Sequence, residues 1–225
     1  MRAFLMVVLL SLLATTAQAG VICGSPALPP GCGAYVTPAQ VHASYTAGSS
    51  QITLSTIAHF GFGGIVVQNI GLDEQEQFNS TVTGLVLVDA NPPFPITLNG
   101  PVTTIVRNKV GNTTGTFDTE IVALSLVSSN PIPIQIRESP TLQSLGKTTI
   151  TGVGGGNYRI DSFFDVFTEL SLDGGQTWIP QNERNGTRVE LQPEPSSVVL
   201  MGLGCVSLIL WRRRRARAGD PGTHC

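Results

Sequence analysis

The sequence predicts an all-β protein built around a single β-sandwich-like domain, and two observations support this fold class. Charged residues make up only 12% of the 225-residue chain, whereas 25 glycines and 15 prolines are present. Globular proteins carry about 25% charged residues, and the Gly, Pro, Thr, Ser and Val that replace them here favour turns and strands. Short alternating or apolar runs separated by turn residues also recur from residue 49 to residue 191, a spacing typical of a sandwich or a related barrel.

Six runs in this region are expected to form strands. The first alternates with period two, as a half-buried strand does, and the second and third are mainly apolar, like buried strands. Clusters rich in Pro, Gly and Asn at 91–95, 111–115 and 154–157 provide turns between the strands. The expected strands cover residues 51–57, 64–67, 83–88, 102–106, 120–127 and 132–136.

The N-terminal residues 1–19 have the three parts of a secretory signal peptide. Arg2 provides the positive charge, an apolar run follows at 3–14, and Ala17 and Ala19 supply small residues before Gly20. Signal peptidase reads this arrangement, so we expect cleavage before Gly20. The alternative is an uncleaved membrane anchor, for which the apolar run is short compared with the roughly 20 residues of a membrane span.

A Cys-, Pro- and Gly-rich segment at 20–48 follows the expected cleavage site. Cys23 and Cys32 are the only cysteines between that site and the C-terminal apolar run. Because exported proteins fold under oxidising conditions, we expect these two cysteines to form a disulfide. The alternative is a pair of free thiols, while a zinc site would need further ligands nearby.

The C-terminal segment combines three features in a fixed order. The first is Pro193, Glu194 and Pro195, and the second is an uncharged run at 196–211 that we expect to form a transmembrane helix slightly shorter than the usual 17–25 residues. The third is a basic stop-transfer cluster at 212–217, which favours the cytoplasmic side of the membrane. A polar tail at 218–225 ends the chain. The cluster begins with Arg212, Arg213, Arg214 and Arg215.

The segment 193–217 resembles a PEP-CTERM sorting domain. In that family a Pro-Glu-Pro motif, a short Gly-containing hydrophobic helix and an arginine cluster direct exported proteins of Gram-negative and related bacteria to exosortase, a membrane-embedded transpeptidase-like enzyme. The resemblance implies that Pro193, Glu194 and Pro195 are the recognition signal. It also implies a transient inner-membrane anchor, followed by delivery to the cell surface or the extracellular space. The alternative is a permanently anchored periplasmic protein.

Three carboxylates form the strongest candidate for a metal site. Asp161, Asp165 and Glu169 are spaced four residues apart and would share a face on either a helix or a strand. We expect a strand, because aromatic and β-branched residues dominate the segment and glycines flank it. The carboxylates then alternate with Phe163 and Phe167 on a solvated acidic face, and a calcium site is the alternative. No other metal or cofactor is expected.

The residues after this strand resemble a single Asp-box, a hairpin motif of many β-propellers. The resemblance implies a structural role in a hairpin and no catalytic role, and a propeller would not fit in a domain of this size. Trp178 and Tyr158, together with the acidic face, are the candidate contacts if the domain binds surface polysaccharide. The matching residues are Ser171, Asp173, Gly175, Thr177 and Trp178.

The charge balance and the lack of complete catalytic motifs limit the classes of function that we expect. Residues 20–192 contain thirteen acidic and seven basic residues, which argues against nucleic-acid binding. The sequence 146–148 resembles the end of a phosphate-binding loop but lacks the first glycine of that motif, and His42 and His59 lie outside any catalytic signature. We therefore expect an exported cell-surface or extracellular-matrix protein without catalytic activity, processed by signal peptidase and exosortase. A polysaccharide- or calcium-binding module and a secreted hydrolase are the alternatives.

Overall fold

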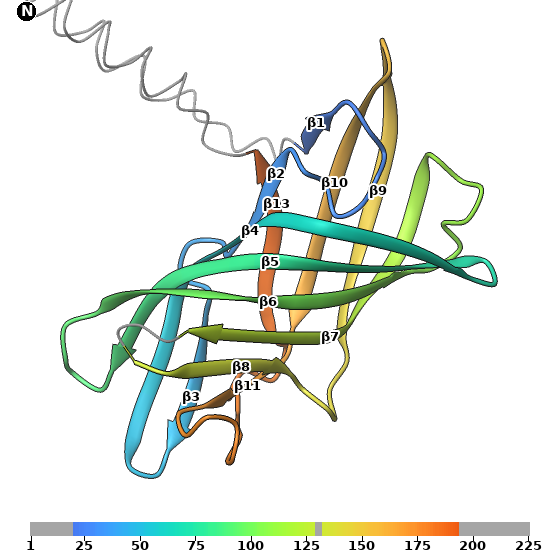
Figure 1. Cartoon of the computed structure of the whole chain (residues 1–225). Helices are drawn as coiled ribbons and strands as arrows, with labels where there is room; N and C mark the ends of the chain where they lie inside the picture. The colour runs from blue at the N-terminus through green and yellow to red at the C-terminus, as the bar shows by residue number, and fades with distance from the viewer. Residues whose placement is uncertain (1–19, 129–131, 194–225) are drawn as a thin grey trace, which may run out of the picture.

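A computed structural model describes residues 20–128 and 132–193, and every regular element in these residues is a strand (Figure 1). The all-β prediction is therefore confirmed. The predicted signal peptide, transmembrane helix, arginine cluster and polar tail lie outside the described residues. Over the part of the chain that the structure describes, no helix has the length and apolar character needed to cross a membrane.

Thirteen strands follow one another along the chain. All six predicted strands overlap observed ones, but the observed strands are mostly longer, and the predicted strands at 51–57 and 64–67 are parts of one strand. The strands are β1 (Val21–Cys23), β2 (Gly33–Val36), β3 (His42–Ala47), β4 (Ser50–Ile70), β5 (Asp73–Val88), β6 (Phe94–Val106), β7 (Gly115–Ser128), β8 (Ile134–Glu138), β9 (Ser144–Gly154), β10 (Asn157–Val166), β11 (Thr168–Ser171), β12 (Ile179–Pro180) and β13 (Thr187–Pro193).

Eight of these strands close into an antiparallel barrel. The strands β4, β5, β6 and β7 form a meander, and β9 pairs with both β7 and β10. The ring closes because β13 pairs with β10 and β2, and β2 pairs with β4. The sandwich-like prediction is thus refined to a closed ring, in which the double pairing of β9 removes the free edges that an open sheet would have.

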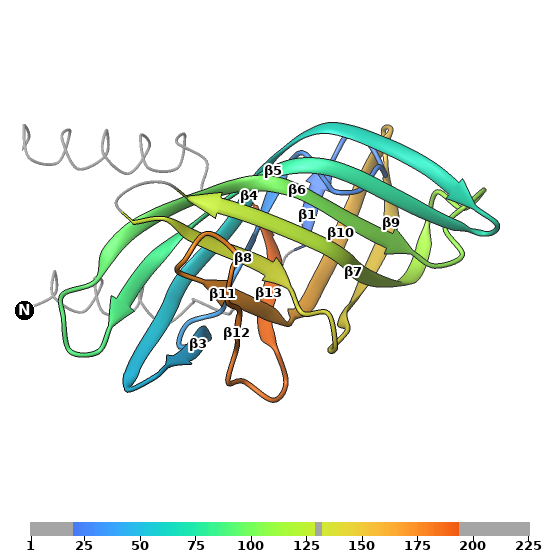
Figure 2. The same ribbon diagram turned by 60° about the horizontal axis from the view of Figure 1, so that its bottom comes forward.

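The remaining strands extend the sheet beyond the ring. At one end β1 pairs with β10. At the other end β7 changes partner from β9 to β8, β8 pairs with β11, and β11 pairs with β12. An isolated bridge between Tyr45 of β3 and Gln181 brings this group next to β3, as Figure 2 shows. The ring strand β9 and the group formed by β8, β11 and β12 adjoin different parts of β7. The arrangement of strands at this end therefore still resembles a sandwich.

The core lies inside the ring because inward side chains alternate with outward ones along each strand. On β5, for example, Phe78, Val82 and Val86 are buried while their neighbours are more exposed. Leu98 of β6 and Ile160 of β10 are completely buried. Burial of such side chains is the main stabilising contribution to the barrel.

The two ends of the described chain meet at one end of the barrel (Figure 1). Val21 of β1 lies opposite Ile160, and Pro193 of β13 lies opposite Gly33 of β2. Gly33 stands between the two end strands, where a Cβ atom would come within 2.8 Å of the Gln192 carbonyl oxygen and 2.9 Å of Val21 Cγ1. This position therefore requires the absence of a side chain.

Candidate functional site

The first residue of the predicted sorting motif is part of the barrel. Pro193 is the last residue of β13 and is exposed, and its register partner is Gly33. Proline cannot donate a backbone hydrogen bond, so it suits the end of a strand. The sorting motif consequently begins at the barrel edge without a linker, whereas Glu194, Pro195 and the arginines 212–215 lie outside the described residues.

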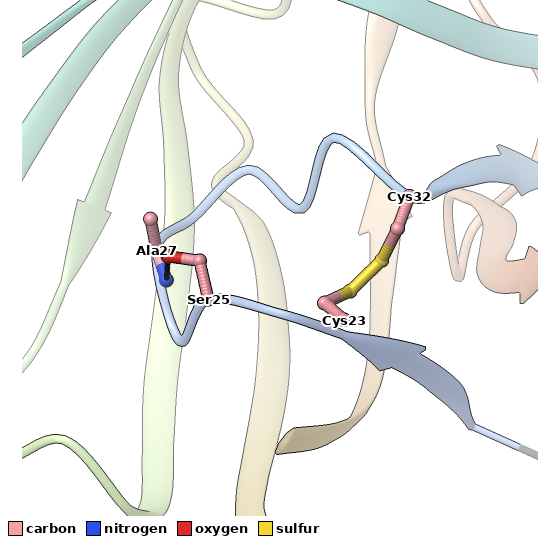
Figure 3. The surroundings of a disulfide bond; sticks show 4 residues. All are labelled: Cys23, Ser25, Ala27 and Cys32. Atoms are coloured by element: carbon pink, nitrogen blue, oxygen red, sulfur yellow. Dashed lines mark hydrogen bonds between the residues drawn. A yellow bond between two sulfur atoms is a disulfide. The ribbon is translucent and has the colours of Figure 1, made fainter. Parts of the chain in front are cut away.

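A disulfide holds the strands next to this edge. The Sγ atoms of Cys23, at the end of β1, and Cys32, directly before β2, are bonded, with 5.8 Å between the two Cα atoms (Figure 3). The intervening loop turns inward, and its Leu28 and Pro29 are buried against the barrel interior. The disulfide thus ties β1 to β2, the strand that pairs with Pro193.

The segment containing Asp161, Asp165 and Glu169 is extended, as the sequence predicts, but it is divided between two strands. Asp161 and Asp165 belong to β10, whereas Glu169 belongs to β11, which pairs with β8 instead of the ring. The division falls at Phe167, whose N–H donates to Ser144 Oγ at 2.9 Å. All three carboxylates point away from the core, but the change of partner separates Glu169 from the other two.

Each of the three carboxylates has its own surroundings. Asp165 pairs with Arg188 at 3.2 Å, and Glu169 pairs with Arg137 at 2.6 Å. Asp161 lies beside Gly20, where a Cβ atom would collide with its carboxylate. In residues 20–128 and 132–193 no three His, Cys, Asp or Glu side chains are grouped so that they could hold a metal ion.

The aromatic side chains considered for polysaccharide binding are also separated. The Arg137 guanidinium lies 4.2 Å from the centre of the Trp178 ring and covers one face of it. Tyr158 is near the start of β10, opposite Cys23, whereas Trp178 follows β11 at the other end of the molecule. These two rings do not form a common platform for a sugar.

The Asp-box residues form the loop of the β11–β12 hairpin. Asp173 Oδ1 accepts hydrogen bonds from the backbone N–H groups of Gln176 at 3.0 Å and Thr177 at 2.9 Å, and Ser171 Oγ accepts one from Gly175 N–H at 2.8 Å. The hydrogen bond from the Thr177 hydroxyl, followed by those from the Thr177 backbone and Ser171, lowers the pKa of Asp173 to about 2. Gly174 and Gly175 adopt positive φ, which the turn requires. These hydrogen bonds shape the turn, and both carboxylate oxygens of Asp173 accept hydrogen bonds within it.

Inside the ring the structure reveals a polar group that the sequence analysis does not single out. Glu76 of β5 is only 2% exposed, and Thr104 Oγ1 of β6 donates to its Oε2 at 3.1 Å. Burial is the main cause that raises the pKa of Glu76 to about 7, with a further rise from Glu74 and an opposing effect of Lys109. Glu76 lies on the same inward face of β5 as Phe78 and Val82, so period-two alternation along β5 could have indicated its burial.

A second buried titratable group is His59 of β4. The residue as a whole is only half-buried, but its Nε2 atom is buried and has no hydrogen-bond partner within residues 20–128 and 132–193. Burial lowers the pKa of His59 to about 4. The ring packs edge-on against Phe62 at 5.1 Å, so His59 belongs to the aromatic part of the core.

The described residues form an all-β barrel, and the sequence continues from its last strand into a C-terminal segment. A family model described as the PEP-CTERM protein-sorting motif matches residues 193–215. The chain therefore carries a PEP-CTERM sorting motif, which indicates exosortase-dependent sorting and membrane anchoring during that process. No curated protein and no solved structure matches this chain.

Proposed function

We propose that the chain is a cell-surface or extracellular-matrix protein whose barrel is delivered by the exosortase route and has no catalytic activity of its own. The observation that carries this proposal is the match to the sorting motif at residues 193–215, which begins at the last residue of β13. Residues 193–215 act as a substrate for a separate processing enzyme. The barrel is the cargo.

The position of the two chain ends supports this role. Gly20, where we expect signal peptidase to cut, and Pro193, where the sorting motif begins, leave the barrel at the same end. Both membrane-directed segments therefore attach to one side of the domain. During sorting the opposite side, formed by β3, β8, β11 and β12, faces away from the membrane.

The contacts of the acidic face and of Trp178 argue against calcium or polysaccharide binding. Asp165 and Glu169 are each paired with an arginine, and Arg137 covers a face of Trp178. The two carboxylates that calcium would need and one face of the ring on which a sugar would stack are therefore already in contact with arginines.

Removal of the motif carboxylate tests the proposal. If exosortase reads the Pro-Glu-Pro signal, Glu194→Gln should keep most of the protein in the inner-membrane fraction with its C-terminal segment attached. Immunoblots of membrane, surface and medium fractions from producing cells measure this. Asp220→Asn makes the same chemical change outside the motif and should be sorted normally. Equal sorting of both variants would contradict the proposal.

A further inference from the structure

The interior of the barrel contains a cavity with a volume of about 90 Å³. Most of its lining is apolar, and it includes Leu28 and Pro29 from the disulfide-closed loop. The disulfide-closed loop therefore forms part of the wall of this space. Further apolar lining comes from several strands of the ring, with Val82, Val102, Val106, Ile121, Leu124 and Phe164 among the contributors.

Three of the polar residues in this lining lie on the neighbouring strands β5, β6 and β7, and the others are Tyr35, Tyr45, His59, Thr148, Thr168 and Thr187. Glu76 of β5 lies opposite Thr104 of β6, and Thr119 of β7 lies opposite Val106, two residues further along β6. All three polar side chains are more than nine-tenths buried and line the cavity. Three adjacent strands thus bring a carboxyl and two hydroxyl groups to one region of the wall.

The polar region has hydrogen-bonding capacity that the protein does not use. Among the described residues, two cavity-lining side chains, Thr119 with its Oγ1 and His59 with its Nε2, have a buried polar atom without a hydrogen-bond partner. A buried polar group without a partner destabilises the folded state, so such groups are normally paired with protein, water or a ligand. The nearby cation, Lys109, lies 3.8 Å from Glu74 and forms its ion pair with that residue. Glu76 consequently faces the cavity with the Thr104 hydroxyl as its donor.

We infer that this cavity is a binding site for a small, neutral molecule with a mainly apolar body and one hydroxyl group. The hydroxyl accepts a hydrogen bond from Thr119, while the body occupies the apolar part of the cavity. An anion is disfavoured by the Glu76 carboxyl, and a cation would lose its hydration in a largely apolar space. An uncharged, mainly apolar ligand therefore suits the lining.

Titration of the exported protein with phenol tests this inference, with benzene as the probe that lacks the hydroxyl. We expect saturable phenol binding, seen as NMR shift changes at the methyl groups of Val102, Val106 and Ile121. Benzene should bind about tenfold more weakly, as expected for the loss of one hydrogen bond. Phenol and benzene binding with equal affinity would overturn the inference, and so would shifts confined to surface residues.

Thr119→Val keeps the shape of the side chain and removes only the unpartnered hydroxyl, so the protein should fold normally. It should lower the affinity for phenol about tenfold and leave that for benzene within twofold. Thr97→Val, at an exposed position of β6, is the matched control and should change neither affinity. Equal phenol binding by the Thr119 variant and the control would contradict the assignment.

A third variant tests the location of the site. Val106→Ile adds one methylene to the cavity wall and should exclude phenol while unfolding stability stays close to that of the unchanged protein. Phenol binding that survives this substitution would place the ligand elsewhere. A cavity that holds ordered water only, with no binding of either probe, would also refute the inference.

Discussion

At the scale of single residues, the barrel interior holds a buried acid, Glu76, and a histidine, His59, whose ring nitrogen is buried. Burial raises the pKa of Glu76 to about 7 and lowers that of His59 to about 4. Both shifts favour the uncharged form, as desolvation does for any buried acid or base. The interior can therefore contain both groups near pH 6 without a net charge.

The two shifts make opposite contributions to the pH dependence of stability. The folded protein holds the Glu76 proton more tightly than the unfolded chain, so this group's contribution falls as pH rises from about 4.5 to about 7. The folded protein binds a proton at His59 less tightly, so the contribution of His59 falls as pH decreases from about 6.5 to about 4. Between pH 4.5 and 6.5 the two effects largely cancel.

Replacing Glu76 should remove one of these two opposing contributions to the pH dependence of stability. Relative to the unchanged protein, Glu76→Gln should gain stability as pH rises from 4.5 to 7, by an amount on the order of 3 kcal/mol, and the difference should then stay constant. Urea unfolding of both proteins at several pH values between 4.5 and 8 measures it. Parallel stability curves would show that Glu76 titrates normally.

At the scale of elements, the strands were easier to predict than their partners. Alternation correctly placed Asp161 and Asp165 on an outward face, because that pattern is local to the strand. The break at Phe167 depends on Ser144, which is remote in sequence and accepts a hydrogen bond from the Phe167 N–H. Sequence reasoning therefore expected one strand where the chain passes from β10 to β11.

The length of β4 was missed for a related reason. Glycines normally separate strands, but Gly61 and Gly64 adopt positive φ inside β4, next to register shifts in its pairing with β5. They form irregularities within a continuous strand instead of a turn. Ring closure through β9 is likewise a consequence of long-range pairing, which a local pattern does not contain.

The junction of β2 and β13 provides a test at this scale. Gly33→Ala should lower the free energy of unfolding by about 1–3 kcal/mol, because the added Cβ atom would collide with the Gln192 carbonyl oxygen. Gly24→Ala is the control, since a Cβ atom at that position meets nothing within 4 Å. Urea unfolding measures both variants. Similar stabilities for the two would show that the end strands are not closely packed beside the sorting motif.

At the scale of the whole molecule, the barrel connects a predicted signal peptide to a sorting motif through strands at one end. The disulfide between Cys23 and Cys32 fixes β1 to β2 at that end, and β13 runs directly into the motif. The sequence alone indicated both targeting segments, because their signals are local. The proximity of Gly20 and Pro193 depends on the closed ring and could be seen only in the structure.

The intact mass of the protein recovered from the surface or medium of producing cells tests the account most directly. Processing at both ends predicts a chain that starts at Gly20 and ends at or after Pro193 but before Arg212. A mature protein that still contains residues 212–225 would contradict exosortase processing and would indicate a permanent C-terminal anchor.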